Sequence, residues 1–283
     1  MRWTPGGRSE NLEDRRGESA GPRFAVRGLG GVGLGGFLLL LVLSLVFKTD
    51  FLRLLSTDDG SAPGDQPAEQ EAPIQVPAEE PLVQFVSFVL DDVEAVWGRL
   101  LPTLGRPYQD AHLVLFRDAV ESTCGLAQSA TGPFYCPADG KVYIDLGFYR
   151  ELRERFGAPG DFAQAYVIAH EIGHHVQKLL GRGEAARGPF GGRDNGMSVR
   201  LELQADCYAG VWAHSTARRD LLEAGDLEEG LNAAAVGDDR LQRMSGRRVN
   251  PDSFTHGSSR QRTDWFRRGF ESGRPEGCDT FGQ

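Results

Sequence analysis

The pattern of apolar and polar residues separates one unbroken hydrophobic segment from the rest of the chain. Residues 28–47 carry no charged side chain and end in the run LLLLVLSLVF. At a rise of about 1.5 Å per residue, a segment of this length crosses a hydrocarbon layer of roughly 30 Å. A buried core helix would show a polar face, and a cleaved signal peptide would have a shorter apolar region. The pattern therefore favours a single transmembrane helix.

Polar segments lie on both sides of residues 28–47. Residues 1–27 are polar and rich in arginine, a composition that predicts disorder. Residues 48–81 are acidic and rich in proline, as in an extended linker. Because positive charge next to a membrane span favours the cytoplasmic side, the N-terminus is predicted to be cytoplasmic. The domain after the span is then predicted to be extracytoplasmic.

Residues 82–283 carry the signals of a folded domain. Asp161 is a candidate N-cap for a long central helix, and Gly181 is a candidate stop for it. Helical spacing predicts helices over 82–101, 147–156, 161–180, 197–223, 228–244 and 258–270, and short apolar runs predict strands over 112–116, 134–136 and 141–146. The pattern predicts an α+β fold, mostly helical, with a small sheet ahead of the central helix.

The charge balance limits the kinds of molecule that the protein is expected to bind. The chain of 283 residues has a net charge of −9, from 31 basic and 40 acidic residues. Binding to phosphate backbones needs a basic surface, so this balance argues against nucleic acid as the main partner.

The central helix contains the sequence His170-Glu171-Ile172-Gly173-His174. One helical turn is about 3.6 residues, so His170 and His174 leave the same face and can meet one metal ion. Glu171 follows the first histidine and is placed beside the metal, where it can take a proton from a bound water. This spacing predicts the zinc site of a peptidase.

A catalytic zinc site needs a third protein ligand and one open position. Glu202 and Asp206 lie four residues apart on the next predicted helix and share a face. Glu202 is the candidate third ligand, and Asp206 is the candidate partner for the outer nitrogen of a ligating histidine. The alternative is that both are solvated charges on an amphipathic helix.

The sequence gives less support for a catalytic or metal-binding role of the other histidines. His256 stands just before a predicted helix, where it could stabilise the oxyanion formed during hydrolysis, or could be a loop residue without a catalytic part. His175 points about 100° away from His174 and is expected to be a packing or surface residue. His112 and His214 are expected to be structural.

Four cysteines, Cys124, Cys136, Cys207 and Cys278, give no C-x-x-C spacing. An even number in a domain predicted to lie outside the membrane indicates two disulfides. Of the three possible pairings, the short turn between the first two cysteines favours Cys124 with Cys136. Cys207 would then pair with Cys278 and pin the C-terminal tail.

Several blocks of the sequence match a known family. They lie at residues 1–3, 9–17, 124–125, 132–137, 142–145, 170–177, 202–210 and 256–259. Through them the chain resembles the neutral zinc metallopeptidase family, bacterial membrane-anchored proteins of the zincin type. The resemblance implies zinc as the metal, His170 and His174 as ligands and Glu171 as general base. By similarity to the gluzincin pattern it also implies Glu202 as third ligand, with Asp206 behind it.

The resemblance to zincins also bears on the substrate. In those folds a peptide adds to an edge strand beside the active-site helix, so residues 141–146 are expected to form that edge. The glycine- and alanine-rich region 181–196 is expected to be a mobile flap. The leading interpretation is a membrane-anchored zinc metallopeptidase acting on a peptide or protein, with one Zn²⁺ per chain. The alternative is a catalytically silent zincin-like module that binds peptides or envelope partners.

Overall fold

The computed structural model describes residues 1–18, 79–128, 132–182 and 194–282. Within these ranges, no helix combines the length and the apolar character needed to cross a membrane. The predicted span 28–47 lies outside the described residues, together with nearly all of the linker and most of the region 181–196. The expectations for those three segments stay predictions.

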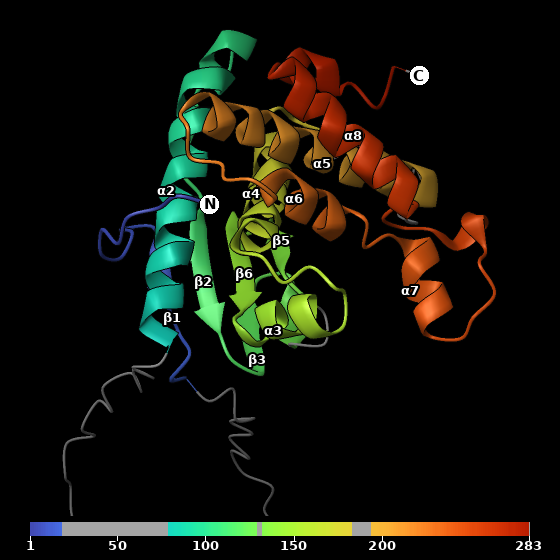
Figure 1. Ribbon diagram of the computed structural model, residues 1–283, viewed down its shortest axis with the longest axis horizontal. Helices are drawn as coiled ribbons and strands as arrows, with labels where there is room; N and C mark the ends of the chain where they lie inside the picture. Colours follow the sequence, from blue (N-terminus) through green and yellow to red (C-terminus); the bar gives the residue numbers. More distant parts are fainter. Residues whose placement is uncertain (19–78, 129–131, 183–193, 283) are drawn as a thin grey trace, which may run out of the picture. The chain divides into compact units, whose positions relative to one another are not determined.

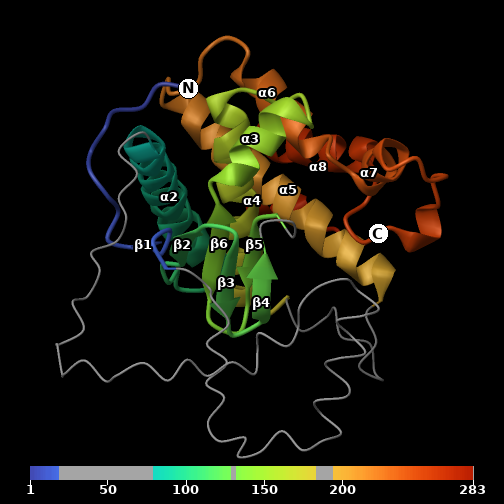
Figure 2. The same ribbon diagram turned by 90° about the horizontal axis from the view of Figure 1, so that it is seen from below.

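The main sheet has four strands in the order β1-β2-β6-β5 (Figures 1 and 2). Strands β1 (Leu12–Asp14), β2 (His112–Phe116) and β6 (Lys141–Asp145) are parallel, and β5 (Phe134–Cys136) pairs with β6 in the antiparallel sense. The strand predicted at the edge of the sheet, 141–146, is therefore an interior strand. The free edge next to β6 belongs to β5, which contacts the central helix.

Both faces of the sheet are covered, which explains the continuous apolar runs of β2 and β6. Alternate residues such as Leu113 and Ile144 face the helices, while Val114 and Tyr143 belong to a second, smaller core. The hairpin of β3 (Ala119–Ser122) and β4 (Gly125–Gln128) covers that second core. The hydrophobic pattern did not predict the hairpin, because its strands place few apolar side chains inward and Leu126 is 62% exposed.

The N-terminal segment corrects the prediction of disorder over 1–27, since residues 1–18 are folded onto the domain. Strand β1 pairs with β2, with Leu12 opposite Leu113. The Arg16 side chain is 1% exposed and contacts Glu79 at 2.8 Å. The α-ammonium group of Met1 lies 2.6 Å from Asp161. Composition suggested a solvated arm because Glu79 and Glu80, which tie Arg16 and Arg8 to the domain, are far away in the sequence. Residues 19–27 lie outside the described part.

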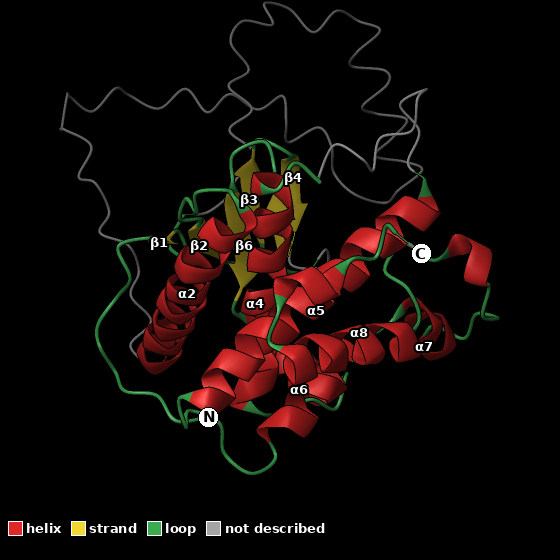
Figure 3. Cartoon of the chain, turned by 90° about the horizontal axis from the view of Figure 1, so that it is seen from above, coloured by secondary structure: helices red, strands yellow, loops and turns green. Residues whose placement is uncertain are grey.

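Helix α4 (Asp161–Leu179) is the predicted central helix and contacts β5 and the four helices α2, α3, α5 and α6. Its N-cap is Gly160, not Asp161. The other helices are α2 (Glu80–Leu100), α3 (Gly147–Glu154), α5 (Asn195–Arg218), α6 (Asp226–Ala234), α7 (Asp238–Met244) and α8 (Ser259–Ser272). Figure 3 shows α5, α6 and α8 gathered on the side away from the strands. The structure confirms a mostly helical α+β fold.

The helix predicted over 228–244 is two helices, α6 and α7, with a break at Gly237. A Cβ atom at Gly237 would lie 2.2 Å from the backbone nitrogen of Ser259. The chain therefore leaves the helical path where it passes the start of α8, and Gly237 becomes the N-cap of α7. Local periodicity continues through this point and gives no sign of the close approach.

Helices α5 and α8 run side by side at a separation that only glycine allows (Figure 1). A Cβ atom at Gly210 would lie 2.1 Å from the carbonyl oxygen of Phe266, and one at Gly269 would lie 1.9 Å from that of Cys207. The structure also contains the two favoured disulfides, Cys124–Cys136 and Cys207–Cys278. The second fixes the C-terminal tail to α5.

Candidate metal centre

The crossing of α4 and α5 places the two halves of the predicted metal site together. A Cβ atom at Gly173 would lie 3.1 Å from the Cα and carbonyl oxygen of Ala205. Glycine at this position therefore lets the backbones approach closely. As a result, the histidine-bearing face of α4 meets the face of α5 that carries Glu202.

His170, His174 and Glu202 form a candidate metal centre. One ligand atom from each lies within 4.8 Å of the others. Glu202 Oε2 is 3.2 Å from His170 Nε2, and Glu202 Oε1 is 3.5 Å from His174 Nε2. The imidazole planes are nearly perpendicular, at 88°. The structure thus brings together the three residues that the sequence predicted as ligands.

The outer nitrogen of each histidine has its own acceptor. His170 Nδ1 lies 2.8 Å from Asp206 Oδ1, and His174 Nδ1 lies 2.9 Å from Gln177 Oε1. An acceptor at Nδ1 holds the proton there and leaves the Nε2 lone pair for a metal. Asp206 therefore has the predicted place behind His170. Gln177 has the same place behind His174, and the sequence analysis did not single it out.

The carboxylates around the two histidines favour the binding of a cation. His170 has a carboxylate at each ring nitrogen; burial opposes its charge, but Asp206 and Glu202 outweigh burial and raise its pKa to about 10. Burial likewise opposes the charge on Glu202, and the two histidines overcome it to hold the pKa of Glu202 well below its usual range. Two imidazole nitrogens and a carboxylate that converge in this way are a donor set typical of Zn²⁺. The residues therefore fit the metal that the motif implies.

A second acidic cluster is less suited to a metal. Asp161, Asp226 and Glu229 also bring their oxygens within 4.8 Å of one another. Asp161 and Asp226 lie 2.6 and 3.3 Å from the ammonium group of Met1. Glu229 accepts a hydrogen bond from the backbone N–H of Phe162. The folded N-terminal segment thus already places a positive charge between two of these carboxylates.

Glu171 is buried on the same helix, with 7% of its surface exposed. Burial raises the pKa of its carboxyl, while the neighbouring His170 and His174 lower it. A carboxylate that is partly desolvated is a stronger base than one in water. This environment suits the proton transfer expected of Glu171.

Arg262, on α8, completes the site and was not predicted. Its Nε and Nη2 atoms each lie 2.8 Å from an oxygen of Asp206, and Nη2 is 3.1 Å from the hydroxyl oxygen of Tyr166. Tyr166 donates a short hydrogen bond to Asp206. Asp206 is fully buried, so the guanidinium provides the charge that keeps it ionised. In the sequence, Arg262 stands among several exposed arginines and nothing local distinguishes it.

His256 lies in the loop before α8, and Asp238 at the start of α7 holds that loop. One oxygen of Asp238 accepts hydrogen bonds from the backbone N–H groups of Thr255, His256 and Gly257. The other lies 3.4 Å from His256 Nδ1. The interaction with Asp238 raises the pKa of His256, burial opposes it, and Glu202 adds to the rise. Its side chain is 50% exposed.

The three remaining histidines have structural surroundings. His175 is buried and lies 3.0 Å from the hydroxyl of Tyr135 and 2.6 Å from the carbonyl oxygen of Gln109. This confirms it as a packing residue. His214 Nδ1 lies 2.7 Å from the carbonyl oxygen of Phe270. His112 is exposed at the start of β2.

Comparisons with known proteins agree with this geometry. The family model described as "Putative neutral zinc metallopeptidase" matches residues 1–281. The chain belongs to this zinc metallopeptidase family. The match includes the N-terminal segment that forms β1 as well as the residues of the metal centre.

Two relatives show how much of this chain the similarity covers. The chain is 48% identical to "Uncharacterized protein YpfJ" of Escherichia coli strain K12 over 292 residues, covering 100% of this chain and 99% of the relative. It is 48% identical over 204 residues to "Uncharacterized protein Rv2575" of Mycobacterium tuberculosis strain H37Rv, covering 68% of each. No solved structure matches the chain.

Proposed function

We propose that the protein is a zinc-dependent peptidase that hydrolyses a peptide bond in a peptide or protein substrate. The observation that carries the proposal is the convergence of His170 Nε2, His174 Nε2 and Glu202 beside the buried Glu171. His170, His174 and Glu202 would hold one zinc ion per chain. When bound, zinc supplies the Lewis acidity that polarises the scissile carbonyl and acidifies a water molecule.

The residues around the ligands carry the proton transfers and the charge. Glu171 takes a proton from the attacking water and passes it to the leaving amine. His256, whose pKa is raised by its contact with Asp238, stabilises the negative oxygen that develops on the substrate. Asp206 and Gln177 keep the ligating histidines in the tautomer that presents Nε2.

The alternative function is a silent module that binds peptides without cutting them. Such a module could lose the general base or a ligand without consequence, whereas Glu171, His170, His174 and Glu202 are all present here. The buried position of Glu171 between the two ligating histidines suits proton transfer and is not needed for peptide binding alone. These features favour the peptidase.

The two disulfides support an extracytoplasmic place for the catalytic domain, since disulfides persist in oxidising compartments. A peptidase in that compartment meets envelope or secreted proteins and peptides, which we propose as its substrate class.

Metal analysis and a peptidase assay of the full chain, alongside Glu171→Gln, test the proposal. We expect about one zinc per chain in both proteins and a loss of turnover of roughly 10²–10⁴-fold in the variant. Equal turnover in the two proteins would refute the role of Glu171. Zinc in both with no turnover in the unmutated chain on diverse peptides would favour the silent module, and absence of zinc from both would refute the metal centre.

A further inference from the structure

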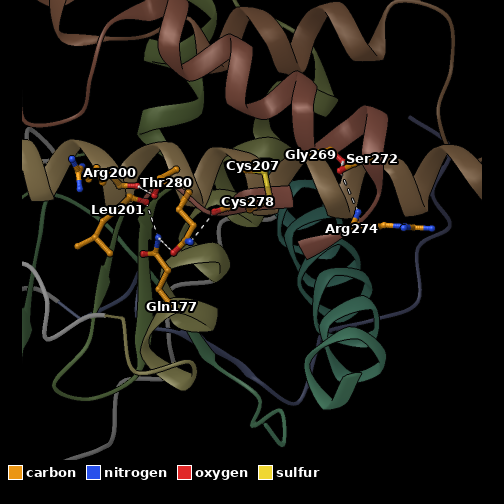
Figure 4. Close-up of a disulfide and its surroundings, with 10 residues drawn as sticks. Gln177, Arg200, Leu201, Cys207, Gly269, Ser272, Arg274, Cys278 and Thr280 are labelled. Atoms are coloured by element: carbon orange, nitrogen blue, oxygen red, sulfur yellow. Dashed lines mark hydrogen bonds between the residues drawn. A yellow bond between two sulfur atoms is a disulfide. The ribbon is translucent and has the colours of Figure 1, made fainter. Parts of the chain in front are cut away.

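A disulfide attaches the C-terminal tail to α5, the helix that carries Glu202 (Figure 4). Cys278, at the end of the short turn Pro275–Cys278, forms a disulfide with Cys207, and neither residue is exposed. The hydroxyl of Thr280 donates a hydrogen bond to the carbonyl oxygen of Arg200. The tail thus has one covalent attachment and one hydrogen bond to the same helix.

Two buried glutamines connect this tail to a zinc ligand. Gln204 Nε2 donates a hydrogen bond to the carbonyl oxygen of Cys278, at 2.8 Å. Gln177 Nε2 donates to Gln204 Oε1 at 3.2 Å, and Gln177 Oε1 lies 2.9 Å from His174 Nδ1. Gln177 and Gln204 are each 2% exposed. Figure 4 shows the hydrogen bonds that lead from Gln177 toward Cys278, next to the Cys207–Cys278 disulfide.

The carbonyl group of Cys278 fixes the direction of each hydrogen bond in the series from Cys278 to His174. A backbone carbonyl can only accept, so the amide of Gln204 must present its NH₂ group to Cys278 and its oxygen to Gln177. Gln177 must then direct its NH₂ group at Gln204 and its oxygen at His174. The carbonyl of Leu201, which accepts from Gln177 Nε2 at 2.7 Å, requires the same orientation.

The consequence for His174 is a fixed tautomer. Facing an acceptor oxygen, Nδ1 carries the proton and Nε2 keeps a lone pair for the metal. A flipped amide at Gln177 would set an NH₂ group against the protonated nitrogen and favour the opposite tautomer. The position of the tail therefore bears on the readiness of His174 to bind zinc.

We propose that the Cys207–Cys278 disulfide is a redox-sensitive support for the metal centre, acting through Gln204 and Gln177 as positioning residues for His174. The proposal rests on the proposed zinc site. A dithiol reductant would supply two electrons and two protons, converting the disulfide to two thiols while becoming a disulfide itself. The tail would then be free to leave α5, and Gln204 would lose the Cys278 carbonyl that orients its amide, leaving the Leu201 carbonyl alone to orient Gln177.

The test measures zinc affinity by competition with a chelator, using the full chain. We expect the Cys207→Ser/Cys278→Ser double variant and Gln204→Met to bind zinc about 10–100-fold more weakly than the unmutated chain. The Cys124→Ser/Cys136→Ser double variant is the matched control, because its disulfide joins the β3–β4 hairpin to β5 and takes no part in the hydrogen bonds from Cys278 through Gln204 and Gln177 to His174. It should keep the affinity of the unmutated chain.

A double-mutant cycle separates positioning from general destabilisation. In the Cys207→Ser/Cys278→Ser background, adding Gln204→Met should weaken zinc binding little further. Both changes break the same series of contacts between Cys278 and His174. Gln204→Met keeps the disulfide and has a similar volume, so it tests the relay even if the cysteine variant folds poorly. Unchanged affinity in Gln204→Met, or equal losses in the two disulfide variants, would overturn the proposal. Failure of the unmutated chain to bind zinc would instead refute the metal centre.

Discussion

Arg262 and Asp206 form a bidentate ion pair between α8 and α5, in which two guanidinium nitrogens each lie 2.8 Å from a carboxylate oxygen. Asp206 in turn contacts His170 Nδ1 at 2.8 Å. Through this pair a residue near the C-terminus determines the charge behind a metal ligand 92 positions earlier in the sequence.

Arg262→Met should lower the free energy of unfolding of the metal-free protein by about 3–5 kcal/mol, because it leaves the buried Asp206 carboxylate without its partner. Arg262→Lys should cost less, since the charge remains but the bidentate geometry is lost. Urea unfolding measures both. The control is Arg260→Met on the same helix, whose side chain is 91% exposed and which should change stability by less than about 0.5 kcal/mol. Equal effects at the two arginines would contradict the assignment.

His256→Ala should lower kcat by about 10²–10³-fold while leaving zinc affinity unchanged, because the imidazolium acts on the substrate oxygen and holds no metal. Steady-state kinetics and chelator competition measure the two quantities. His112→Ala, at an exposed position of β2, is the control. Turnover that survives His256→Ala intact, in an enzyme inactivated by Glu171→Gln, would remove His256 from the mechanism.

Gly269→Ala should destabilise the protein by about 1–3 kcal/mol and lower the melting temperature, because the added Cβ atom would lie 1.9 Å from the carbonyl oxygen of Cys207. Gly98→Ala in α2 is the matched control, since nothing lies within 4 Å of its Cβ position. That change should raise stability by about 0.5–1 kcal/mol through helix propensity. Thermal unfolding distinguishes the opposite signs.

Glu94 should make stability depend on pH. It is 5% exposed and accepts hydrogen bonds from Asn11 Nδ2 and the Ala111 backbone N–H. Burial raises the pKa of its carboxyl from 4.5 to about 7, with Asp110 and Asp91 adding to the rise and the two hydrogen bonds opposing it. The folded protein therefore binds a proton that the unfolded chain has released between these pH values.

The contribution of Glu94 is fully present below pH 4.5 and is lost as pH rises through about 7. The loss corresponds to about 3 kcal/mol. Urea unfolding at about pH 5 and pH 8 should show a smaller decrease in Glu94→Gln than in the unmutated chain. Identical pH dependence in the two proteins would show that the carboxyl titrates normally.

Much of the fold and the ligand set follows from local sequence, because helix period and a four-residue spacing are local properties. The long helices, the disulfide pairs and the meeting of His170 with Glu202 were predicted in this way. Arg262 and Gln177 were not, since each looks like an ordinary polar helix residue until tertiary packing supplies its partner. Strand β1 was missed for the same reason: its partner strand β2, with Leu113 opposite Leu12, is remote in sequence.

Strand β1 has a consequence for the path of the chain. Residues 1–18 and 79–282 belong to one folded unit, so both ends of the intervening segment must emerge on the same side of any bilayer. A single crossing by residues 28–47, with the N-terminus cytoplasmic and the catalytic domain outside, would remove β1 from the sheet. Topology reporters at the two termini should then give the same signal.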